Sequence, residues 1–470
     1  MPALALLPVL RVGPDYAPPA ADVPAAWNRL EDGGSATGSA APGDLSRWWR
    51  VLDDQLLSRL IDEALEASPD LRHARAILRE ARARRTVAAA GQFPEVTAAA
   101  SARRGTSSEE AGSGDTSDLF SAGLDAGWEI DVFGGVRRDI EAADADLQAS
   151  EANLHDTRVS LAAEVALNYV EVRGLQQRLS IARTNLASQS ETLQLTEWRA
   201  QAGLVSSQDV EQARSNREQT RAQIPSLETS LAEAEHRLDI LLGKTPGTLH
   251  ARLAAEGNQP AMPARIAVGI PADTLRQRPD IRSAERQLAA ETARVGVAEA
   301  ARYPSFSLSG SIGLEALTAE ALAGSSAATS SLLAGITAPV FDAGRLKSQV
   351  EIRDAIRDQA EIAYQQAVLA ALQEVENALV ALARTAEREQ ALAGAAEAAG
   401  NAAQMARQQY SAGLIDFQAV LDTERTELSV TDSLASTRTD GMLALISLYK
   451  ALGGGWSSQS ESSQAGKDTP

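Results

Sequence analysis

Strict alternation of apolar and polar residues marks four short stretches of this chain. Between Phe120 and Val132 the even positions read Phe, Ala, Leu, Ala, Trp, Ile and Val, and the odd ones Ser, Gly, Asp, Gly, Glu and Asp. Successive side chains of a strand point to opposite faces, so this stretch predicts a strand with one apolar and one polar face. The alternation predicts strands at about 93–104, 119–133, 303–314 and 331–341.

Apolar residues spaced by three and four dominate much of the remaining chain. One such seam, typical of helices that pack along one another, consists of Val368, Leu372, Val375, Leu379 and Leu382. Two runs of roughly 65 residues contain no proline, and Gly203 and Gly413 fit the left-handed position that ends a helix. Long helices are predicted at 136–201, 206–243, 345–412 and 416–452.

These elements occur twice, at an offset of about 210 residues. SPDLRHARAIL (68–78) returns as RPDIRSAERQL (278–288), and FPEVTAAAS (93–101) returns as YPSFSLSGS (303–311). A duplication is the simplest explanation of the repeated order. The chain therefore divides into a signal-like and extended segment, a first repeat, a second repeat and a disordered tail, at 1–43, 44–258, 259–453 and 454–470.

The strands are as long as a tilted strand must be to cross a bilayer. Four strands are too few to close a barrel, and lipid does not tolerate open sheet edges, so two or three subunits must share one barrel. The predicted fold is mainly α-helical with a membrane β part, in which each chain contributes four strands to a shared barrel continued by long coiled-coil helices.

Composition narrows the classes of function. A net charge of −19 without a basic stripe argues against nucleic acid as a partner. The chain contains no cysteine, which excludes disulfides and thiolate chemistry, and no apolar run is long enough for a transmembrane helix. We expect no enzyme, no cofactor and no metal site, because no catalytic motif occurs and the histidines are scattered, at His73, His155, His236 and His250.

Six motifs carry a family resemblance. They are VGPDYAPPAADVPAAW (12–27), RWW (47–49), RPDI (278–281), YPSF (303–306), PVFDAGR (339–345) and YSAGLIDFQAVLDTE (410–424). Together they resemble the outer-membrane efflux protein family, the TolC-like channels of tripartite pumps, with the NodT-type lipoproteins as the nearest subgroup. The resemblance covers about residues 12–453. It implies a homotrimer with a twelve-stranded outer-membrane β-barrel and a helical tunnel that extends into the periplasm.

The resemblance also implies partners and an anchor. The partners are a periplasmic membrane-fusion adaptor and an inner-membrane transporter of the RND type. In the subgroup a lipidated cysteine stands just before VGPDY, whereas this chain reads PVLRVGPDY, so no acyl anchor is expected on the sequence as written. The start, MPALALLPVLR, resembles the apolar part of a secretion signal.

Candidate residues of the barrel follow from the alternation. We expect an apolar face against lipid and a polar face, with Asp125, Glu129 and Asp131, against a water-filled lumen. Trp128 near a strand end suits the membrane interface. The lipid-facing residues are predicted to be Phe120, Leu124, Trp128, Ile130, Phe306, Leu308 and Ile312.

The resemblance places a periplasmic gate at Tyr410, Asp416 and Asp422. A ring of carboxylates would narrow the pore and bind cations. For Asp416 a helix N-cap is an equally good explanation, and for Asp422 a solvated helix face is the alternative. The family's basic link residue is not evident near this turn, where Leu414 and Ile415 stand.

The two hairpin tips are the predicted adaptor contacts. Small and apolar residues gather at both tips, although plain turn chemistry would use the same glycines and serines. The predicted contact residues are Gly203, Ser206, Asp209, Gly413 and Leu414.

These features predict a passive exit duct in the bacterial outer membrane, which conducts small solutes from a pump and its adaptor to the exterior. Two alternatives stay open. The same fold could serve type I protein secretion, and the heptads alone would also suit a soluble periplasmic coiled-coil scaffold or adaptor, which would leave the four strands unexplained.

Overall fold

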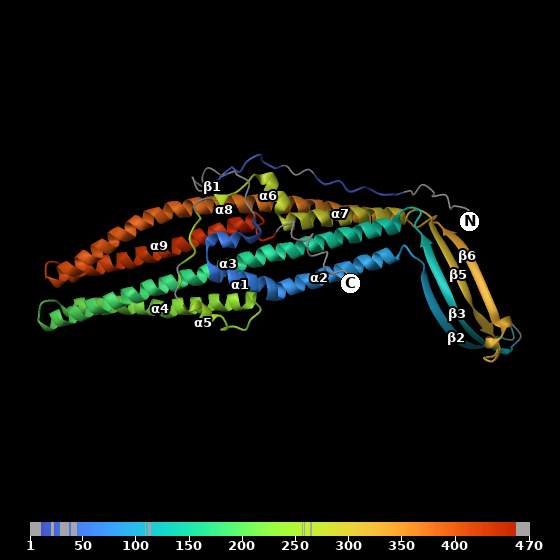
Figure 1. The fold of residues 1–470 in the computed structure, drawn as a ribbon, viewed down its shortest axis with the longest axis horizontal. Helices are drawn as coiled ribbons and strands as arrows, with labels where there is room; N and C mark the ends of the chain where they lie inside the picture. The colour runs from blue at the N-terminus through green and yellow to red at the C-terminus, as the bar shows by residue number, and fades with distance from the viewer. Residues whose placement is uncertain are drawn as a thin grey trace. The chain divides into compact units, whose positions relative to one another are not determined.

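The computed structural model describes residues 11–19, 23–28, 37–38, 45–108, 110, 114–255, 257, 259–263 and 266–456. The predicted signal-like start, residues 1–10, and residues 457–470 of the predicted tail lie outside this part of the chain. Helices make up most of the described chain, together with one four-stranded sheet (Figure 1). None of the helices described is both long and apolar enough to cross a bilayer.

The long helices repeat in length as well as in order. The helix before each strand pair has 22 residues, the one after it has 67, and the returning helix has 35. Equal lengths at equivalent places agree with the duplication that the sequence predicts. The matching pairs are α2 (Pro69–Ala90) with α7 (Pro279–Ala300), α3 (Gly135–Gln201) with α8 (Arg345–Ser411), and α4 (Ser207–Leu241) with α9 (Phe417–Ala451).

The remaining helices and one strand pair are short. The two-residue strands β1 and β4 pair in parallel. These short elements are β1 (Thr37–Gly38), η2 (Leu45–Leu52), α1 (Gln55–Ala67), α5 (His250–Leu253), β4 (Ile266–Ala267), α6 (Pro271–Gln277), η3 (Ala321–Ala323) and η4 (Ser325–Ala327).

The chain forms two compact units. The first contains the four-stranded sheet and consists of Met1–Ala20, Ala76–Ala152 and Arg282–Gln366. The second contains both helical hairpin tips and consists of Ala21–Arg75, Asn153–Ile281 and Ala367–Pro470.

The sheet of the first unit is antiparallel, in the order β2-β3-β5-β6. The structure thus confirms the four strands and joins the two predicted hairpins through β3 and β5. In the described chain β2 and β6 are edge strands, each paired on one side. The strands are β2 (Glu95–Thr106), β3 (Thr116–Ile130), β5 (Ser305–Ala316) and β6 (Ala328–Thr337).

All four strands differ from their predicted ranges, and β2 and β5 each lie two residues later than predicted. β3 begins three residues early, because its pairing with β2 continues to Thr116 opposite Thr106. It ends at Ile130, because the Asp131 carboxylate accepts hydrogen bonds from the amides of Val136 and Arg137 and so turns the chain into α3. β6 lies at 328–337 instead of 331–341, since its pairing partner β5 starts only at Ser305.

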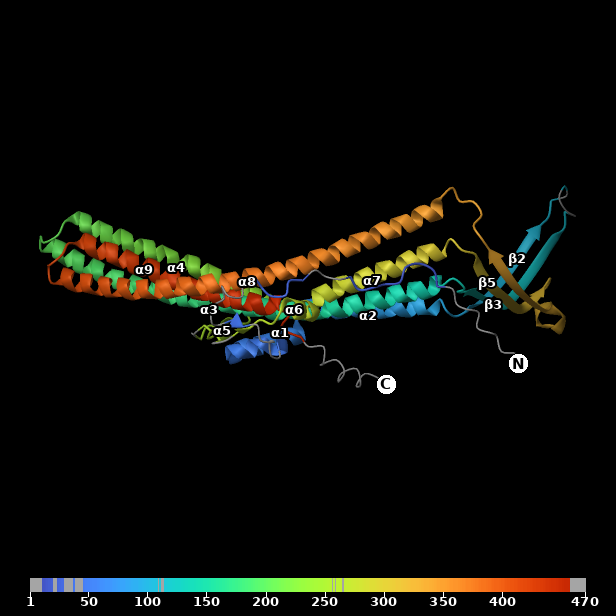
Figure 2. The ribbon, with the colours of Figure 1, turned by 90° about the horizontal axis from the view of Figure 1, so that it is seen from above.

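The core of the second unit packs the early helices against the long ones. Trp48 and Trp49 are almost completely buried, and the Trp48 ring stacks on Tyr449 with ring centres 5.1 Å apart. α3 returns as α4, and α8 returns as α9 (Figure 2). The ends of these four helices share a second apolar cluster, formed by Leu193, Ala213, Ala406, Tyr410, Phe417, Val420 and Leu421.

Candidate functional site

The strand register places the seven predicted lipid-facing residues on one face of the sheet. Because residues opposite one another in an antiparallel pair share a face, apolar residues of β3 and β5 meet across the strands. The pairs are Phe120 with Ala316, Leu124 with Ile312, Trp128 with Leu308, and Ile130 with Phe306. Leu124 and Ile312 are exposed in the single chain, so the described residues leave the apolar face uncovered at these positions.

One aromatic residue of this face has a satisfied polar group. The indole Nε1 of Trp128 donates to the backbone oxygen of Gln92 at 3.0 Å. An aromatic side chain with an apolar body and a satisfied N–H suits the boundary between lipid and water.

The opposite face of the sheet is polar, as the alternation predicts. Asp125 lies opposite Ser311, and Glu129 lies opposite Ser307. Asp131, expected to add free charge to this face, instead caps α3 and forms an ion pair with Arg137 at 2.9 Å. The sequence pattern did not distinguish this capping carboxylate from its exposed neighbours.

The two helical tips have the same backbone geometry. Gly203 and Gly413 have φ angles of 74° and 75°, the left-handed conformation that glycine adopts without strain. The amides of the next residues reach back over a full turn: Leu204 N donates to Arg199 O, and Leu414 N donates to Gln409 O, both at 2.9 Å. This is the Schellman motif. The turn alone therefore accounts for both glycines.

Helix capping occupies most of the polar residues at the tips. Ser206 and Asp209 form a capping box at the start of α4, in which each side chain accepts from the other's backbone amide. Asp416 is the N-cap of α9 and accepts from the amide of Ala419 at 3.1 Å. Asp422 lies within α9, is exposed, and accepts a hydrogen bond from Gln418.

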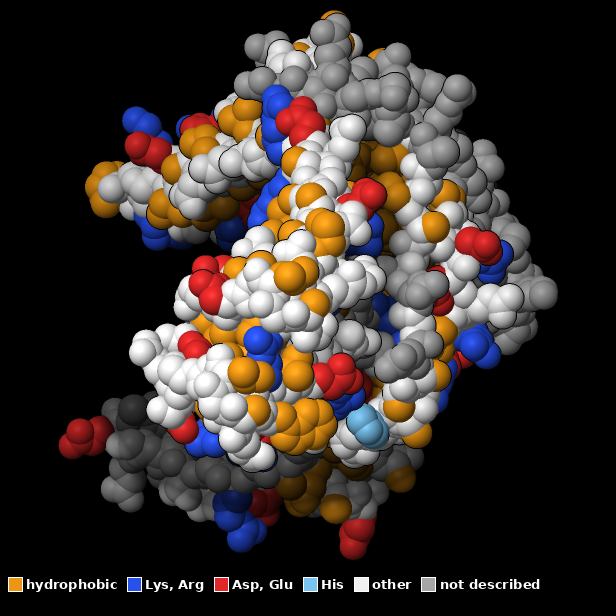
Figure 3. All heavy atoms as spheres, turned by 90° about the vertical axis from the view of Figure 1, so that its left-hand side faces the viewer, with side chains coloured by type: hydrophobic (Ala, Val, Ile, Leu, Met, Phe, Trp, Pro, Cys, Tyr) orange, Lys and Arg blue, Asp and Glu red, His pale blue; other side chains and the backbone are white. Residues whose placement is uncertain are grey.

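Apolar side chains project from both tips. Leu204 is 68% exposed and Leu414 is 75% exposed, although the residue at this position of a Schellman motif commonly packs on its own helix. Trp198 of α3 is also exposed. Figure 3 faces the tips, and hydrophobic and uncharged atoms cover much of the surface nearest the viewer.

Tyr410, a predicted gate residue, is buried inside the tip. Only 1% of it is exposed, and its hydroxyl donates to Thr196 Oγ1 at 3.1 Å. The Arg199 guanidinium lies over the Tyr410 ring and donates to the Tyr410 backbone oxygen. Tyr410 therefore does not share the exposed position of Asp416 and Asp422.

Arg199 is the functional candidate that sequence reasoning missed. The expected basic residue was sought beside Gly413, in the second repeat, whereas Arg199 lies in the first. The repeat offset places Arg199 opposite Gln409 in the alignment, one residue before Tyr410. Only folding brings the two repeats together at this point.

Polar contacts continue between the hairpins below the tips. Thr192 of α3 donates to the Glu424 carboxylate of α9 at 2.8 Å, and Arg407 of α8 donates to Ser188 Oγ of α3 at 3.1 Å. Burial raises the pKa of Glu424 above its ordinary range. The α3–α4 and α8–α9 hairpins are thus held by a set of separable polar contacts in addition to apolar packing.

The sequence and the fold of this chain are similar to those of known proteins. The model of the family described as "Outer membrane efflux protein" matches residues 60–244 and 270–454, once in each repeat. Nodulation protein T of Rhizobium leguminosarum bv. trifolii is 33% identical over 455 residues, with 95% of this chain and 94% of the relative covered. Outer membrane protein OprJ of Pseudomonas aeruginosa is 31% identical over 461 residues, with 96% and 95% covered. The solved structure of the outer-membrane channel OprN is 38% identical, with a TM-score of 0.89 and 95% and 99% covered.

Proposed function

The chain belongs to the outer membrane efflux protein family and is an efflux channel of the outer membrane, and we propose that three copies close one passive conduit for small solutes. The family and the fold are those of channel proteins, not of enzymes. In the proposed assembly, the protein supplies the path and its pump supplies the energy.

The observation that carries the trimer is the open sheet. β2 and β6 each have a free edge in the described chain, and one face of the sheet is apolar and uncovered. Free backbone groups are not tolerated in hydrocarbon, so β2 of one copy must pair with β6 of the next. Three sheets of four strands give twelve strands, a size that leaves room for a lumen. The polar face then lines the lumen, and Phe120, Leu124 and Trp128 face lipid.

The proposed gate is the ring of tips at the periplasmic end. Asp416 and Asp422 are exposed at the start of α9 and can face the pore in the trimer. Tyr410 contributes from within, because its contacts with Arg199 and Thr196 hold α8 against α3. Opening requires the α8–α9 hairpin to move away from α3, which breaks these contacts.

The proposed partners are a periplasmic membrane-fusion adaptor and an inner-membrane transporter of the RND type. Leu204 and Leu414 carry the adaptor site, since both project from equivalent positions of the two tips and are mostly exposed. Gly203 and Gly413 give the tips their shape, and Ser206 with Asp209 fixes the start of α4. Apolar residues on a repeated surface suit a ring of adaptor hairpins.

The mass of the detergent-extracted protein from outer-membrane fractions tests the conduit. Light scattering should give three times the chain mass of 49.5 kDa, and circular dichroism should show strong helix and some strand. Planar bilayers should show discrete conductance steps. A monomer or dimer without conductance would refute the shared barrel.

A further inference from the structure

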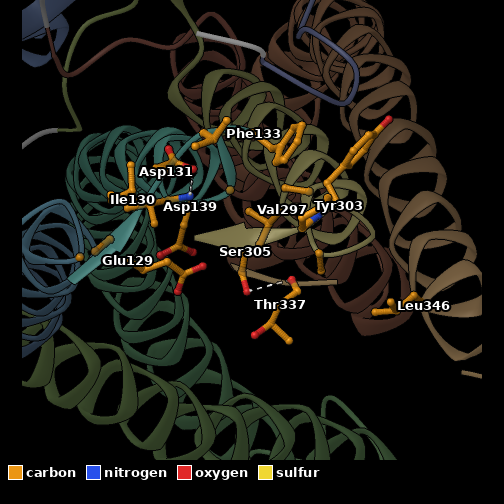
Figure 4. Close-up of a pocket in the computed structure, with 18 of the residues that line it drawn as sticks. Glu129, Ile130, Asp131, Phe133, Asp139, Val297, Tyr303, Ser305, Thr337 and Leu346 are labelled. Atoms are coloured by element: carbon orange, nitrogen blue, oxygen red, sulfur yellow. Dashed lines mark hydrogen bonds between the residues drawn. The ribbon is translucent and has the colours of Figure 1, made fainter. Parts of the chain in front are cut away.

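A cavity of about 930 Å³ opens in the first unit where the polar face of the sheet meets the helices (Figure 4). This size is typical of sites for small organic ligands. Its sheet side includes Glu129, Ser305 and Thr337 of the polar face, together with Ile130 of the apolar face at the end of β3. Most of the sheet side therefore belongs to the face that lines the lumen of the proposed conduit.

Two carboxylates of the lining have no partner. Asp131 pairs with Arg137, and Asp146 pairs with Arg294. Among the described residues, no hydrogen bond or ion pair engages the side chain of Glu129 or Asp139. Figure 4 shows both side chains directed into the cavity, Glu129 from the end of β3 and Asp139 from the first turns of α3.

The rest of the wall is largely apolar. Val297 and Ala300 come from the end of α7, Leu346 comes from α8, and Tyr303 follows α7. The Tyr303 ring stacks on Phe133 with ring centres 4.7 Å apart, which gives the wall a fixed aromatic edge. Arg84 of the lining pairs with Glu80. Among the described residues, the lining charges outside an ion pair are therefore Glu129, Asp139 and Arg345, a balance of one negative charge.

We propose that this cavity binds organic cations with an apolar body during their passage. Glu129 and Asp139 attract the ammonium group, while Val297, Tyr303 and Leu346 contact the apolar part. Both carboxylates are exposed, so their attraction for the cation is weak. Weak binding suits a conduit, because the solute must also leave the site. The site rests on the proposed function, because its exposure to the passing solute depends on the trimeric conduit.

Block of single-channel current tests the site. The wild-type trimer in planar bilayers is titrated with benzyltrimethylammonium, and with tetramethylammonium, which carries the same charge without an aromatic body. We expect benzyltrimethylammonium to block at the lower concentration. Glu129→Gln should weaken that block about fivefold, the scale of one exposed ion pair, and Asp139→Asn should act in the same direction.

Asp125→Asn is the matched control. Asp125 lies on the same strand and the same face, four residues from Glu129, and is not part of the cavity wall. Block unchanged in Asp125→Asn and weakened in Glu129→Gln supports the site. Equal weakening in both variants would overturn it in favour of the general charge of the lumen, and so would equal block by the two cations. A wild-type protein that conducts but is not blocked refutes the site alone, whereas one that forms no channel refutes the conduit and the site together.

Discussion

The guanidinium carbon of Arg199 lies 4.5 Å from the centre of the Tyr410 ring, and its Nη1 donates to the backbone oxygen of Tyr410. One residue belongs to the first repeat and the other to the second, so the contact joins the two hairpins of one chain at their tips. Tyr410 also reaches α3 through Thr196. Together these contacts hold α8 against α3 at the place where we propose that the conduit opens.

Removal of this contact should favour the open conduit. A cation–π contact and one charged hydrogen bond are together worth about 1–2 kcal/mol, so Arg199→Ala should raise the ratio of open to closed channel about tenfold. The open probability of single channels in planar bilayers measures this ratio. Arg183→Ala, which removes an exposed ion pair between α3 and Glu228 of α4, should leave gating unchanged. Equal gating in both variants would remove Arg199 from the latch.

The tip carboxylates should control cation passage. Asp416→Ser with Asp422→Asn should raise conductance and weaken block by multivalent cations, because two negative charges per chain leave the constriction. Serine at 416 keeps an N-cap oxygen for Ala419, so α9 still starts at its normal place. Asp422→Glu keeps the charge and should conduct like the wild type. Unchanged conductance in the double variant would show that these residues do not line the gate.

The exposed leucines at the tips should matter for binding of the adaptor rather than for trimer formation or conductance. We expect Leu204→Ser with Leu414→Ser to abolish co-purification with the adaptor of its own pump, because the apolar contact area at both tips is lost. Trimer mass and conductance should stay normal. Ile240→Ser, which changes an equally exposed apolar residue of α4, should not affect binding. Normal adaptor binding by the double variant would argue against docking at the tips.

A close approach of β3 and β5 should make a side chain at Gly313 destabilising. Gly313 lies opposite Gly123, and a Cβ on Gly313 would lie 2.8 Å from the Ala122 oxygen, so the backbone must shift. Gly313→Ala should destabilise the barrel by about 1–3 kcal/mol. Gly127→Ala, where a Cβ meets no atom within 4 Å, should not. Thermal unfolding followed by circular dichroism compares the two, and equal midpoints would contradict the pairing of β3 with β5.

Stability of the helical hairpins should depend on pH through Glu424. Its pKa is raised by burial above the ordinary value of 4.5, so between these two values the folded protein holds a proton that the unfolded chain has released. The free energy of unfolding therefore falls as pH rises through this interval. Arg407 and Glu427 are the charged groups near it.

Glu424→Gln removes the titrating charge and keeps an acceptor for Thr192. We expect this variant to unfold at a higher temperature than the wild type at pH 8 and at nearly the same temperature near pH 4. Asp432→Asn, which breaks the ion pair with Arg178 between α9 and α3, should show no such gain at high pH. Parallel pH profiles for Glu424→Gln and the wild type would refute the role of burial.

Local chemistry made much of the fold predictable. The alternation along 119–133 depends only on the geometry of a strand. Glycine stands at 203 and 413 because the backbone there has φ near 75°, a conformation that glycine adopts without strain. Ser206 with Asp209 is a capping box that spacing alone identifies. The strand ends were less accurate, because Asp131 turned out to cap α3 and thereby stopped β3 at Ile130.

The sequence by itself determined the strands, the long helices, the tips and the duplication, because each depends on residues close together in the chain or on a constant offset. Tertiary structure alone decided that Tyr410 is buried, that Arg199 is its partner, and that Glu129 and Asp139 open into one cavity. These relationships join residues from distant elements. Their pairing depends on how whole helices and strands pack, and no local pattern records it.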